Sequence, residues 1–114
     1  MVIEAKHVEE VLGVGLLGVT EGTRLAVQHM LARSVGRGGA IVNISSMGGL
    51  LPMPFSVVYS AAKHGVVGLS RSLYHLADPR LGGVRVNCVN PSFVATAMVL
   101  DKCVSFCGFG NALL

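Results

Sequence analysis

A phenol and an ammonium lie four residues apart in the segment YSAAK, residues 59–63, and Ser46 precedes the tyrosine by thirteen residues. Side chains four apart on a helix share one face, so Tyr59 and Lys63 would be neighbours if this segment is helical. A serine at the end of an adjacent strand would meet them there. Ser46, Tyr59 and Lys63 are therefore the candidate catalytic residues of a proton-transfer site.

The chemistry that suits such a trio is the interconversion of an alcohol and a ketone. Moving a hydride to or from carbon requires a proton to join or leave the oxygen on that carbon. A free phenol titrates near pH ~10 and is a poor base at neutral pH, but a lysine ammonium within about 4–6 Å favours the phenolate. A serine hydroxyl would stabilise charge on the substrate oxygen by donating a hydrogen bond.

Plainer interpretations of these residues stay open. Tyr59 could be a partly buried helix tyrosine and Lys63 a solvated charge, which is the usual fate of such a pair. Ser45 is an alternative to Ser46, although its spacing to Tyr59 fits less well. Tyr74 has no lysine four residues later, and it is predicted to be a packing residue.

The other polar side chains that could do chemistry are predicted to be structural. Asparagines at the predicted strands would satisfy backbone groups at strand ends, and the histidines have no acidic partners at recognisable spacing, which favours surface or helix-packing roles. These residues are Asn43, Asn87, Asn90, His7, His29, His64 and His75.

The spacing of apolar residues predicts the elements that would position the trio. Between residues 8 and 32 the apolar side chains recur at helical spacing, which predicts one long helix weakened by glycines. Residues 56–76 show a second helical pattern. Residues 40–44 are short, apolar and β-branched, as expected of a buried parallel strand, and residues 84–89 are predicted to form a second strand. Residues 45–55 contain paired glycines and two prolines, which predicts a loop. Open α/β sheets bind ligands at such loops, beyond the carboxyl ends of strands.

The order helix, strand, helix, strand predicts an α/β fold in which a crossover helix makes the two strands parallel neighbours. Four segments then follow one another in a family's order: Gly22-Thr23-Arg24, GAIVNISS at 39–46, YSAAK followed by Gly65, and VRVN at 84–87 leading into Asn90-Pro91-Ser92. Together they resemble the short-chain dehydrogenase/reductase family over roughly residues 8–98. Residues 63–68 and 91–97 are similar to the branch of that family that includes 15-hydroxyprostaglandin dehydrogenase.

The resemblance implies an NAD- or NADP-dependent oxidoreductase that acts on a small-molecule alcohol or carbonyl substrate through Ser46, Tyr59 and Lys63. It implies no metal. It also implies that Lys63 contacts the nicotinamide ribose, with Tyr59 beside it, and that the carboxamide side of the nicotinamide is lined by residues after the second strand. Those residues are Pro91, Ser92, Val94 and Thr96.

The implied fold is a partial Rossmann-like, doubly wound parallel sheet, with an α-β-α-β core and without the N-terminal dinucleotide-binding strands. The family's glycine-rich phosphate turn would lie upstream of residue 1, since no glycine-rich turn follows a strand in this chain. Residues 1–98 are expected to form the catalytic half of the domain, and residues 99–114 a divergent tail. The acidic or basic residue that selects NAD or NADP would also lie upstream.

Two departures from the family pattern bear on activity. Gly15 stands where the family carries an asparagine that helps to hold a proton-relay water, and Ser92 stands where it carries a glycine. An alternative function follows: a catalytically impaired, truncated member that acts as an oligomerisation partner or modulator of a full-length relative. A homo-oligomer is the other expected association.

Composition excludes several other classes. The net charge of +3 is modest and the basic residues are scattered, which argues against nucleic-acid binding. Three cysteines without a CxxC motif or paired histidines predict reduced thiols, no metal site and a cytoplasmic location. The uncharged stretch at residues 38–62 is interrupted by glycines and prolines, so a membrane span is not expected. The first residues lack a basic segment followed by an apolar stretch and a cleavage site, so a secretory signal is not expected.

Overall fold

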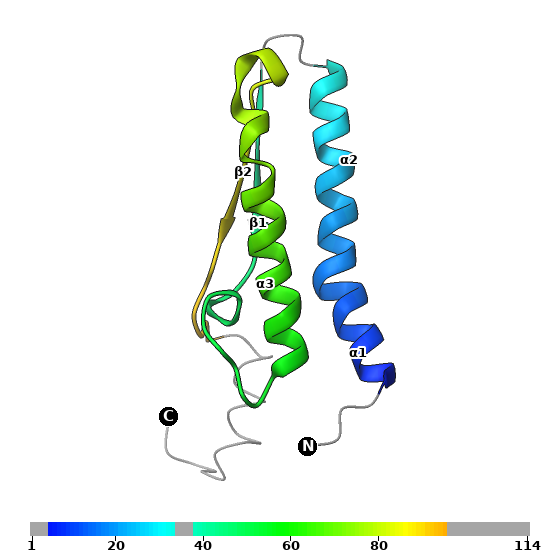
Figure 1. Cartoon of the computed structure of the whole chain (residues 1–114), viewed down its shortest axis with the longest axis vertical. Coiled ribbons are helices and arrows are strands. Elements are labelled where there is room, and N and C mark those ends of the chain that lie inside the picture. The colour runs from blue at the N-terminus through cyan, green and yellow to red at the C-terminus, as the bar shows by residue number, and fades with distance from the viewer. Residues whose placement is uncertain (1–4, 34–37, 96–114) are drawn as a thin grey trace.

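The computed structural model describes residues 5–33 and 38–95. Helix α1 (Ala5–Leu12) continues through one π-helical turn (Gly13–Leu17) into helix α2 (Gly18–Arg33). Strand β1 (Gly39–Ile44), helix α3 (Val57–Ser72) and strand β2 (Val84–Val89) follow (Figure 1). The predicted α/β order is therefore confirmed, with the first helix three residues longer at its start than its apolar pattern indicated.

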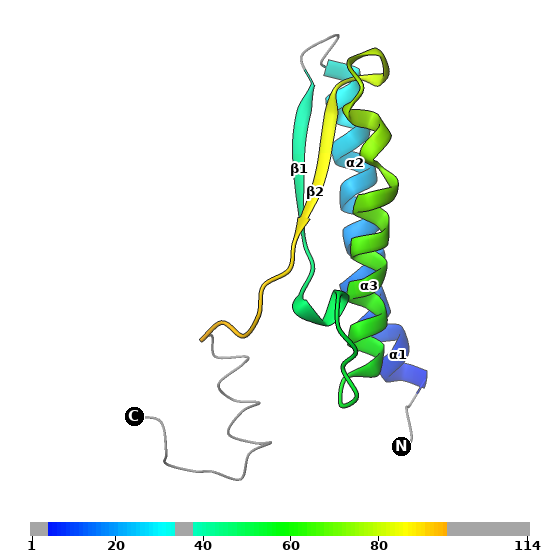
Figure 2. The same ribbon diagram turned by 60° about the vertical axis from the view of Figure 1, so that its left-hand side comes forward.

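The two strands form a parallel sheet in which Gly39 pairs with Val84 and Ile44 pairs with Val89. Helices α2 and α3 both lie on one face of this sheet (Figure 2). Because the strands are parallel, their carboxyl ends meet at one edge of the sheet, and the loop that begins at Ser45 leaves from that edge. Helix α3 returns the chain to the other end of the sheet, so its first turns lie beside the same edge.

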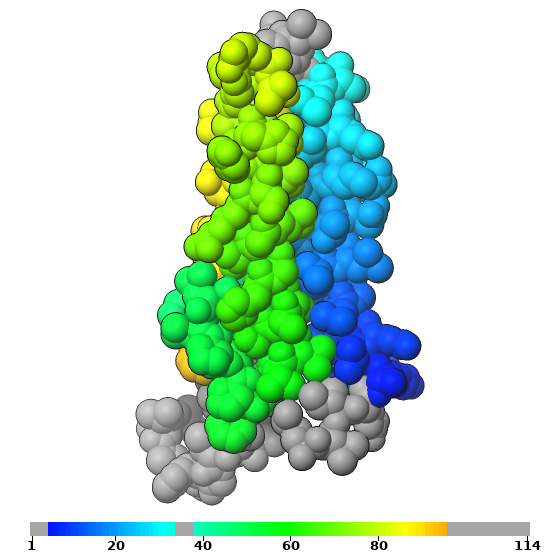
Figure 3. All heavy atoms as spheres, viewed as in Figure 1, coloured from blue at the N-terminus to red at the C-terminus, as the bar shows by residue number. Residues whose placement is uncertain are grey.

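Small residues let the helices approach closely, and Figure 3 shows α3 in contact with the α1–α2 helix along its length. A Cβ atom added at Gly15 would lie 3.3 Å from Cβ of Ala62, and one added at Gly65 would lie 2.7 Å from Cδ1 of Leu16. Gly15 lies within the π-helical turn, where the α1–α2 helix meets α3. A larger side chain at either glycine would require its neighbour to move.

The core contains a chain of buried polar side chains as well as valines. Thr23 Oγ1 donates a hydrogen bond of 2.9 Å to Asn43 Oδ1, and Asn43 Nδ2 donates one of 3.0 Å to Ser70 Oγ. Ser70 Oγ in turn donates to the carbonyl of Val66. These bonds connect α2, β1 and α3. The prediction that Asn43 satisfies backbone groups was wrong, because its amide is bonded to side chains of the two flanking helices.

One face of the sheet is open in the described part of the chain. Val42 and Ile44 are each 56% exposed and Val89 is 45% exposed, whereas Val84 and Val86 on the helical side are buried. The sequence predicted that the strand at residues 40–44 is buried, because its β-branched run is typical of sheets with helices on both sides. That prediction was wrong for the outer face, since the described helices cover the inner one.

The second helix ends earlier than its pattern predicted. Helix α3 stops at Ser72, and a 3₁₀ turn spans Tyr74–Ala77, so the predicted helix to residue 76 is too long as an α-helix. The change of winding at Leu73 directs Tyr74 outward, where it is 76% exposed. Tyr74 is therefore not the packing residue that was predicted. Within residues 5–33 and 38–95, no helix is long and apolar enough to cross a membrane.

The turn before β2 is held by Asp78. Its Oδ1 accepts a hydrogen bond from the backbone N–H of Arg80, and its carboxylate forms an ion pair of 2.6 Å with the Arg80 guanidinium. The Arg80 hydrogen bonds lower the pKa of Asp78. Gly82 and Gly83 then adopt φ angles of 120° and 67°, which side chains disfavour, and lead the chain into β2.

We expect Thr23→Val to lower the free energy of unfolding by about 1–3 kcal/mol, because the buried Asn43 Oδ1 would lose its donor. Urea unfolding of the two proteins measures the difference. Thr20→Val is the matched control: the Thr20 hydroxyl bonds the carbonyl of Leu16 in its own helix, so its loss should change stability by less than about 0.5 kcal/mol. Equal effects of the two substitutions would contradict a stabilising role for the buried chain.

Candidate active site

The candidate site lies at the carboxyl edge of the sheet. Strand β1 leads into Ser45 and Ser46, and a 3₁₀ turn follows at Met47–Gly49. The backbone N–H of Met47 donates a hydrogen bond of 2.9 Å to the carbonyl of Pro91, beyond the end of β2. The segments that follow the two strands are thereby joined beside the first turns of α3.

Tyr59 and Lys63 lie one helical turn apart on α3, as their spacing predicted. The Lys63 ammonium Nζ is 5.7 Å from the centre of the Tyr59 ring, within the range of a cation–π contact. It also donates a hydrogen bond of 3.1 Å to the carbonyl of Ile44, the last residue of β1. The bond fixes the positive charge at the sheet edge, and the phenol, 39% exposed, is accessible to a ligand.

Ser46 directly precedes the 3₁₀ turn at Met47–Gly49. Its Oγ accepts a hydrogen bond of 3.2 Å from the backbone N–H of Gly48. Gly48 also faces the tyrosine ring: a Cβ atom added there would lie 3.3 Å from Cε1 of Tyr59. One buried glycine therefore contacts both the candidate serine and the candidate tyrosine.

Ser45 has a different environment from Ser46. It is 4% exposed, and its Oγ donates a hydrogen bond of 2.9 Å to the carbonyl of Lys63. This bond attaches the end of β1 to α3. The hydroxyl proton of Ser45 is thus used in a bond to the helix. Ser46, by contrast, is only half-buried.

Sequence reasoning missed Ser60, which follows the tyrosine directly. Ser60 is 8% exposed, and its Oγ donates a hydrogen bond of 2.8 Å to the carbonyl of Gly48. The available signals were the glycine pair after Ser46 and a small hydroxyl residue inside the YSAAK segment. Neither signal shows by itself that a loop residue and a helix residue are bonded.

The predicted cofactor-lining residues lie next to this turn. Pro91, Ser92 and Val94 are exposed where the chain leaves β2, and Thr96 lies outside the described residues. Within residues 5–33 and 38–95, the buried Oδ1 of Asn90 has no hydrogen-bond partner, and its Nδ2 is 3.8 Å from Sγ of Cys88. The prediction that Asn90 bonds backbone groups was therefore wrong.

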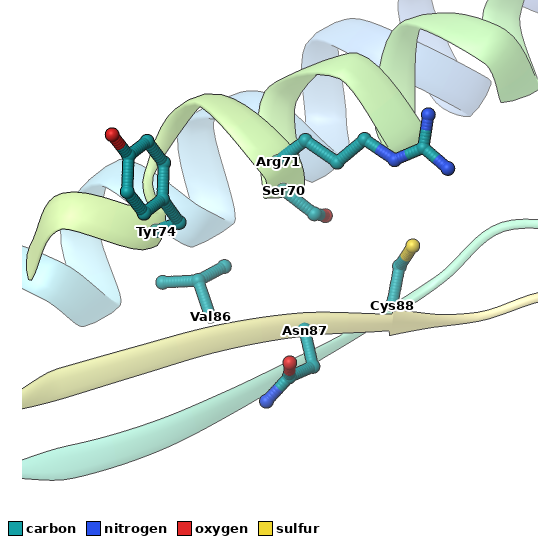
Figure 4. A pocket seen from close by; sticks show the side chains of 6 residues that line it. All are labelled: Ser70, Arg71, Tyr74, Val86, Asn87 and Cys88. Atoms are coloured by element: carbon teal, nitrogen blue, oxygen red, sulfur yellow. The ribbon is translucent and has the colours of Figure 1, made fainter. Parts of the chain in front are cut away.

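A hollow of about 420 Å³ lies between α3 and β2 (Figure 4). Val86 and Cys88 point toward the helix, and Asn87 points away from it. The hollow is lined from Ser70 onward, eleven residues after Tyr59, which is roughly 16 Å along a helix. It is separate from the candidate site. Among residues 5–33 and 38–95, no cluster of metal-ligating side chains is present.

Comparison with known proteins assigns the family. The short chain dehydrogenase family model matches residues 2–103, so the chain belongs to this family. It is 42% identical over 94 residues to human (Homo sapiens) 15-hydroxyprostaglandin dehydrogenase [NAD(+)], a match that covers 82% of this chain and 35% of the relative. A development-specific 25 kDa protein of Sarcophaga peregrina is 39% identical over 100 residues, covering 85% of this chain and 38% of that protein. The chain thus spans little more than a third of the curated relatives it matches.

Solved structures of the same fold agree. ElxO with NADP bound has a TM-score of 0.75 and 30% identity, covering 95% of this chain and 41% of its own. Acetoin dehydrogenase from Enterobacter cloacae has a TM-score of 0.73 and 31% identity, covering 84% and 38%. The α/β architecture, a parallel sheet with flanking helices from part of a Rossmann fold, is therefore that of the family.

We expect Gly49→Ala to lower the free energy of unfolding by about 1–3 kcal/mol, because the added Cβ would lie 2.6 Å from the carbonyl oxygen of Lys63. Gly68→Ala is the matched control: nothing lies within 4 Å of that position, and alanine in a helix interior should stabilise by about 0.5–1 kcal/mol. Thermal unfolding followed by circular dichroism compares them. A Gly49→Ala protein as stable as the parent would contradict the close packing of this turn on α3.

Proposed function

We propose that the chain is an NAD- or NADP-dependent oxidoreductase that interconverts a small-molecule alcohol and ketone. The observation that carries the proposal is the position of the Lys63 ammonium, 5.7 Å from the Tyr59 ring at the edge of the sheet that Ser46 also occupies. Family membership supports the reaction class. The finer assignment of roles comes from the geometry of these three residues.

Tyr59 would transfer the proton. The tyrosine oxygen would accept a proton from an alcohol and return it to a ketone, with the Lys63 ammonium held beside the ring. The Lys63 bond to the carbonyl of Ile44 holds the charge in place through this cycle. Because the ammonium has three N–H donors, the bond to Ile44 leaves two for other partners.

Ser46 would orient the substrate oxygen. The N–H of Gly48 occupies one acceptor position on Ser46 Oγ, and this leaves the hydroxyl proton for donation. A hydrogen bond from that proton would stabilise the negative charge that develops on the substrate oxygen. The oxygen would then lie between a donor on the β1 side and the phenol on α3.

The residues at the sheet edge fit the nicotinamide end of a cofactor. Two N–H donors of Lys63 would meet its ribose hydroxyls, and the exposed Pro91, Ser92 and Val94 would line its carboxamide side, with Thr96 beyond them. When bound, the nicotinamide supplies or accepts the hydride.

We expect Tyr59→Phe to lower kcat by at least about 10²-fold, because it removes the proton-transferring oxygen and keeps the ring. Oxidation of a panel of secondary alcohols with NAD⁺ or NADP⁺, followed through the absorbance of the reduced nicotinamide, measures this. Tyr74→Phe makes the same chemical change at an exposed position beyond α3 and should leave kcat unchanged. Full activity of Tyr59→Phe would exclude Tyr59 as the acid and base.

Cofactor binding is measured separately by calorimetric titration of the folded chain with NADH and then NADPH. Saturation by one of them supports the enzyme and identifies its cofactor. A folded chain that binds neither would not act as an oxidoreductase by itself. Association with another protein would then be its better-supported function.

The second candidate function is association with another copy of the chain or with a full-length relative, as an oligomerisation partner or modulator. It is favoured by apolar side chains that are exposed on the α1–α2 helix: Val14 is 81% exposed, Leu17 60% and Leu25 56%. Exposed apolar groups gathered on one element are typical of protein interfaces. The open outer face of the sheet adds further apolar area.

We expect Leu17→Lys to shift the chain toward monomer by at least about tenfold in dissociation constant, because a lysine charge would be desolvated at such an interface. Analytical ultracentrifugation over a concentration series measures the dissociation constant. Ser72→Lys introduces the same side chain at an exposed position of α3 and serves as the control. Identical sedimentation of the parent and Leu17→Lys would place any interface elsewhere.

A further inference from the structure

We propose that Ser60 is a positioning residue for the candidate catalytic serine, acting through the backbone of Gly48. The inference deepens the proposed function, because it rests on Ser46 as the group that contacts the substrate oxygen. Ser60 itself is 8% exposed and points away from solvent, into the contact between α3 and the turn after β1. It would therefore act without touching the substrate.

The geometry passes through one residue. Ser60 Oγ donates to the carbonyl of Gly48 at 2.8 Å, and the N–H of the same glycine donates to Ser46 Oγ at 3.2 Å. The two groups lie in neighbouring peptide planes that meet at the Gly48 Cα, so the Ser60 bond limits rotation of the Gly48 carbonyl and thereby restricts the positions open to its N–H. Backbone hydrogen bonds from the N–H groups of Met47, Gly49 and Leu50 also hold the turn, and the Ser60 bond adds the link between the Gly48 carbonyl and α3.

The same glycine ties the serine to the tyrosine. A side chain at Gly48 would lie against the ring of Tyr59, so the turn approaches α3 as closely as a glycine allows. Ser60 is the residue next to Tyr59 in the helix. A shift of Gly48 would thus alter both its hydrogen bond to the Ser46 hydroxyl and its packing against the Tyr59 ring.

His64 supports the direction of the Ser60 bond. Its Nδ1 lies 2.9 Å from the carbonyl oxygen of Ser60, and because a carbonyl only accepts, Nδ1 carries the proton. The same Nδ1–H lies 3.4 Å from Ser60 Oγ. Ser60 Oγ therefore faces a donor on the helix side, and its own proton is directed to Gly48.

The consequence for the reaction is a fixed hydrogen-bond polarity. With Gly48 donating to Ser46 Oγ, the Ser46 proton is free to point toward a substrate oxygen, and donation to a hydroxyl oxygen strengthens that hydroxyl as a donor. Without Ser60, the turn could rotate and Ser46 could donate to a backbone carbonyl instead. Loss of Ser60 would therefore weaken the binding of substrate less than it would weaken the stabilisation of charge on the substrate oxygen.

The first test is the amide resonance of Gly48 in the ¹⁵N-labelled full chain. We expect Ser60→Ala and Ser46→Ala both to move this amide proton upfield, since the first releases the Gly48 carbonyl and so lets the residue rotate away from Ser46, and the second removes the acceptor of the N–H. Ser70→Ala removes another buried hydroxyl of α3, which bonds Val66 and Asn43, and should leave the resonance in place. An unmoved Gly48 resonance in Ser60→Ala would overturn the inference.

The second test is kinetic. We expect Ser60→Ala to lower kcat by about tenfold to a hundredfold with KM changed by less than about twofold, and Ser60→Thr, which keeps the hydroxyl, to recover most of kcat. Ser70→Ala corrects for any loss of stability. A kcat for Ser60→Ala equal to that of Ser70→Ala would overturn the inference. Absence of turnover in the parent chain would instead overturn the proposed function, and the Gly48 resonance alone would then decide whether Ser60 orients this turn.

Discussion

The attachment of the loop after β1 to helix α3 is the constraint on which the candidate site depends. Two hydroxyls make it from opposite sides: Ser45 donates to the carbonyl of Lys63, and Ser60 donates to the carbonyl of Gly48. Both bonds require close approach, and it is possible because Gly49 has no Cβ to meet the Lys63 carbonyl. Serine and glycine thus act together, the first as a donor and the second by its lack of volume.

The rest of the fold brings these two elements into register. The small residues Gly15, Ala62 and Gly65 let the α1–α2 helix pack on α3, and the Thr23–Asn43–Ser70 chain joins both helices to β1. Hydrogen bonds have directional requirements that apolar contacts lack, so this chain restricts how β1 can slide along α3. A one-residue slip would turn Asn43 and Ser45 toward the open face, away from α3.

Sequence reasoning reached the α/β order, the parallel pair and the shared face of Tyr59 and Lys63, because these depend on periodicity and local spacing. It did not reach the partners of Asn43 or Ser60, since a hydrogen bond between residues twelve or more apart depends on how the elements pack. The exposure of Tyr74 was missed for a related reason. An apolar pattern continues across the point where the α-helix tightens at Leu73, and the side chain beyond it changes direction.

Local hydrogen bonds position the residues of the candidate site, whereas the stability of the sheet that carries them depends on apolar burial. The contacts that place Ser46, Tyr59 and Lys63 all join residues between Ile44 and Pro91, within one strand, one turn, one helix and the segment after β2. The chain covers little more than a third of the curated relatives it matches, and these contacts lie within its described residues. The apolar outer face of the sheet, by contrast, gains no cover from the described helices. The stability of this chain is therefore limited by the apolar area that its sheet can bury, and the positions of the candidate catalytic residues depend on that stability.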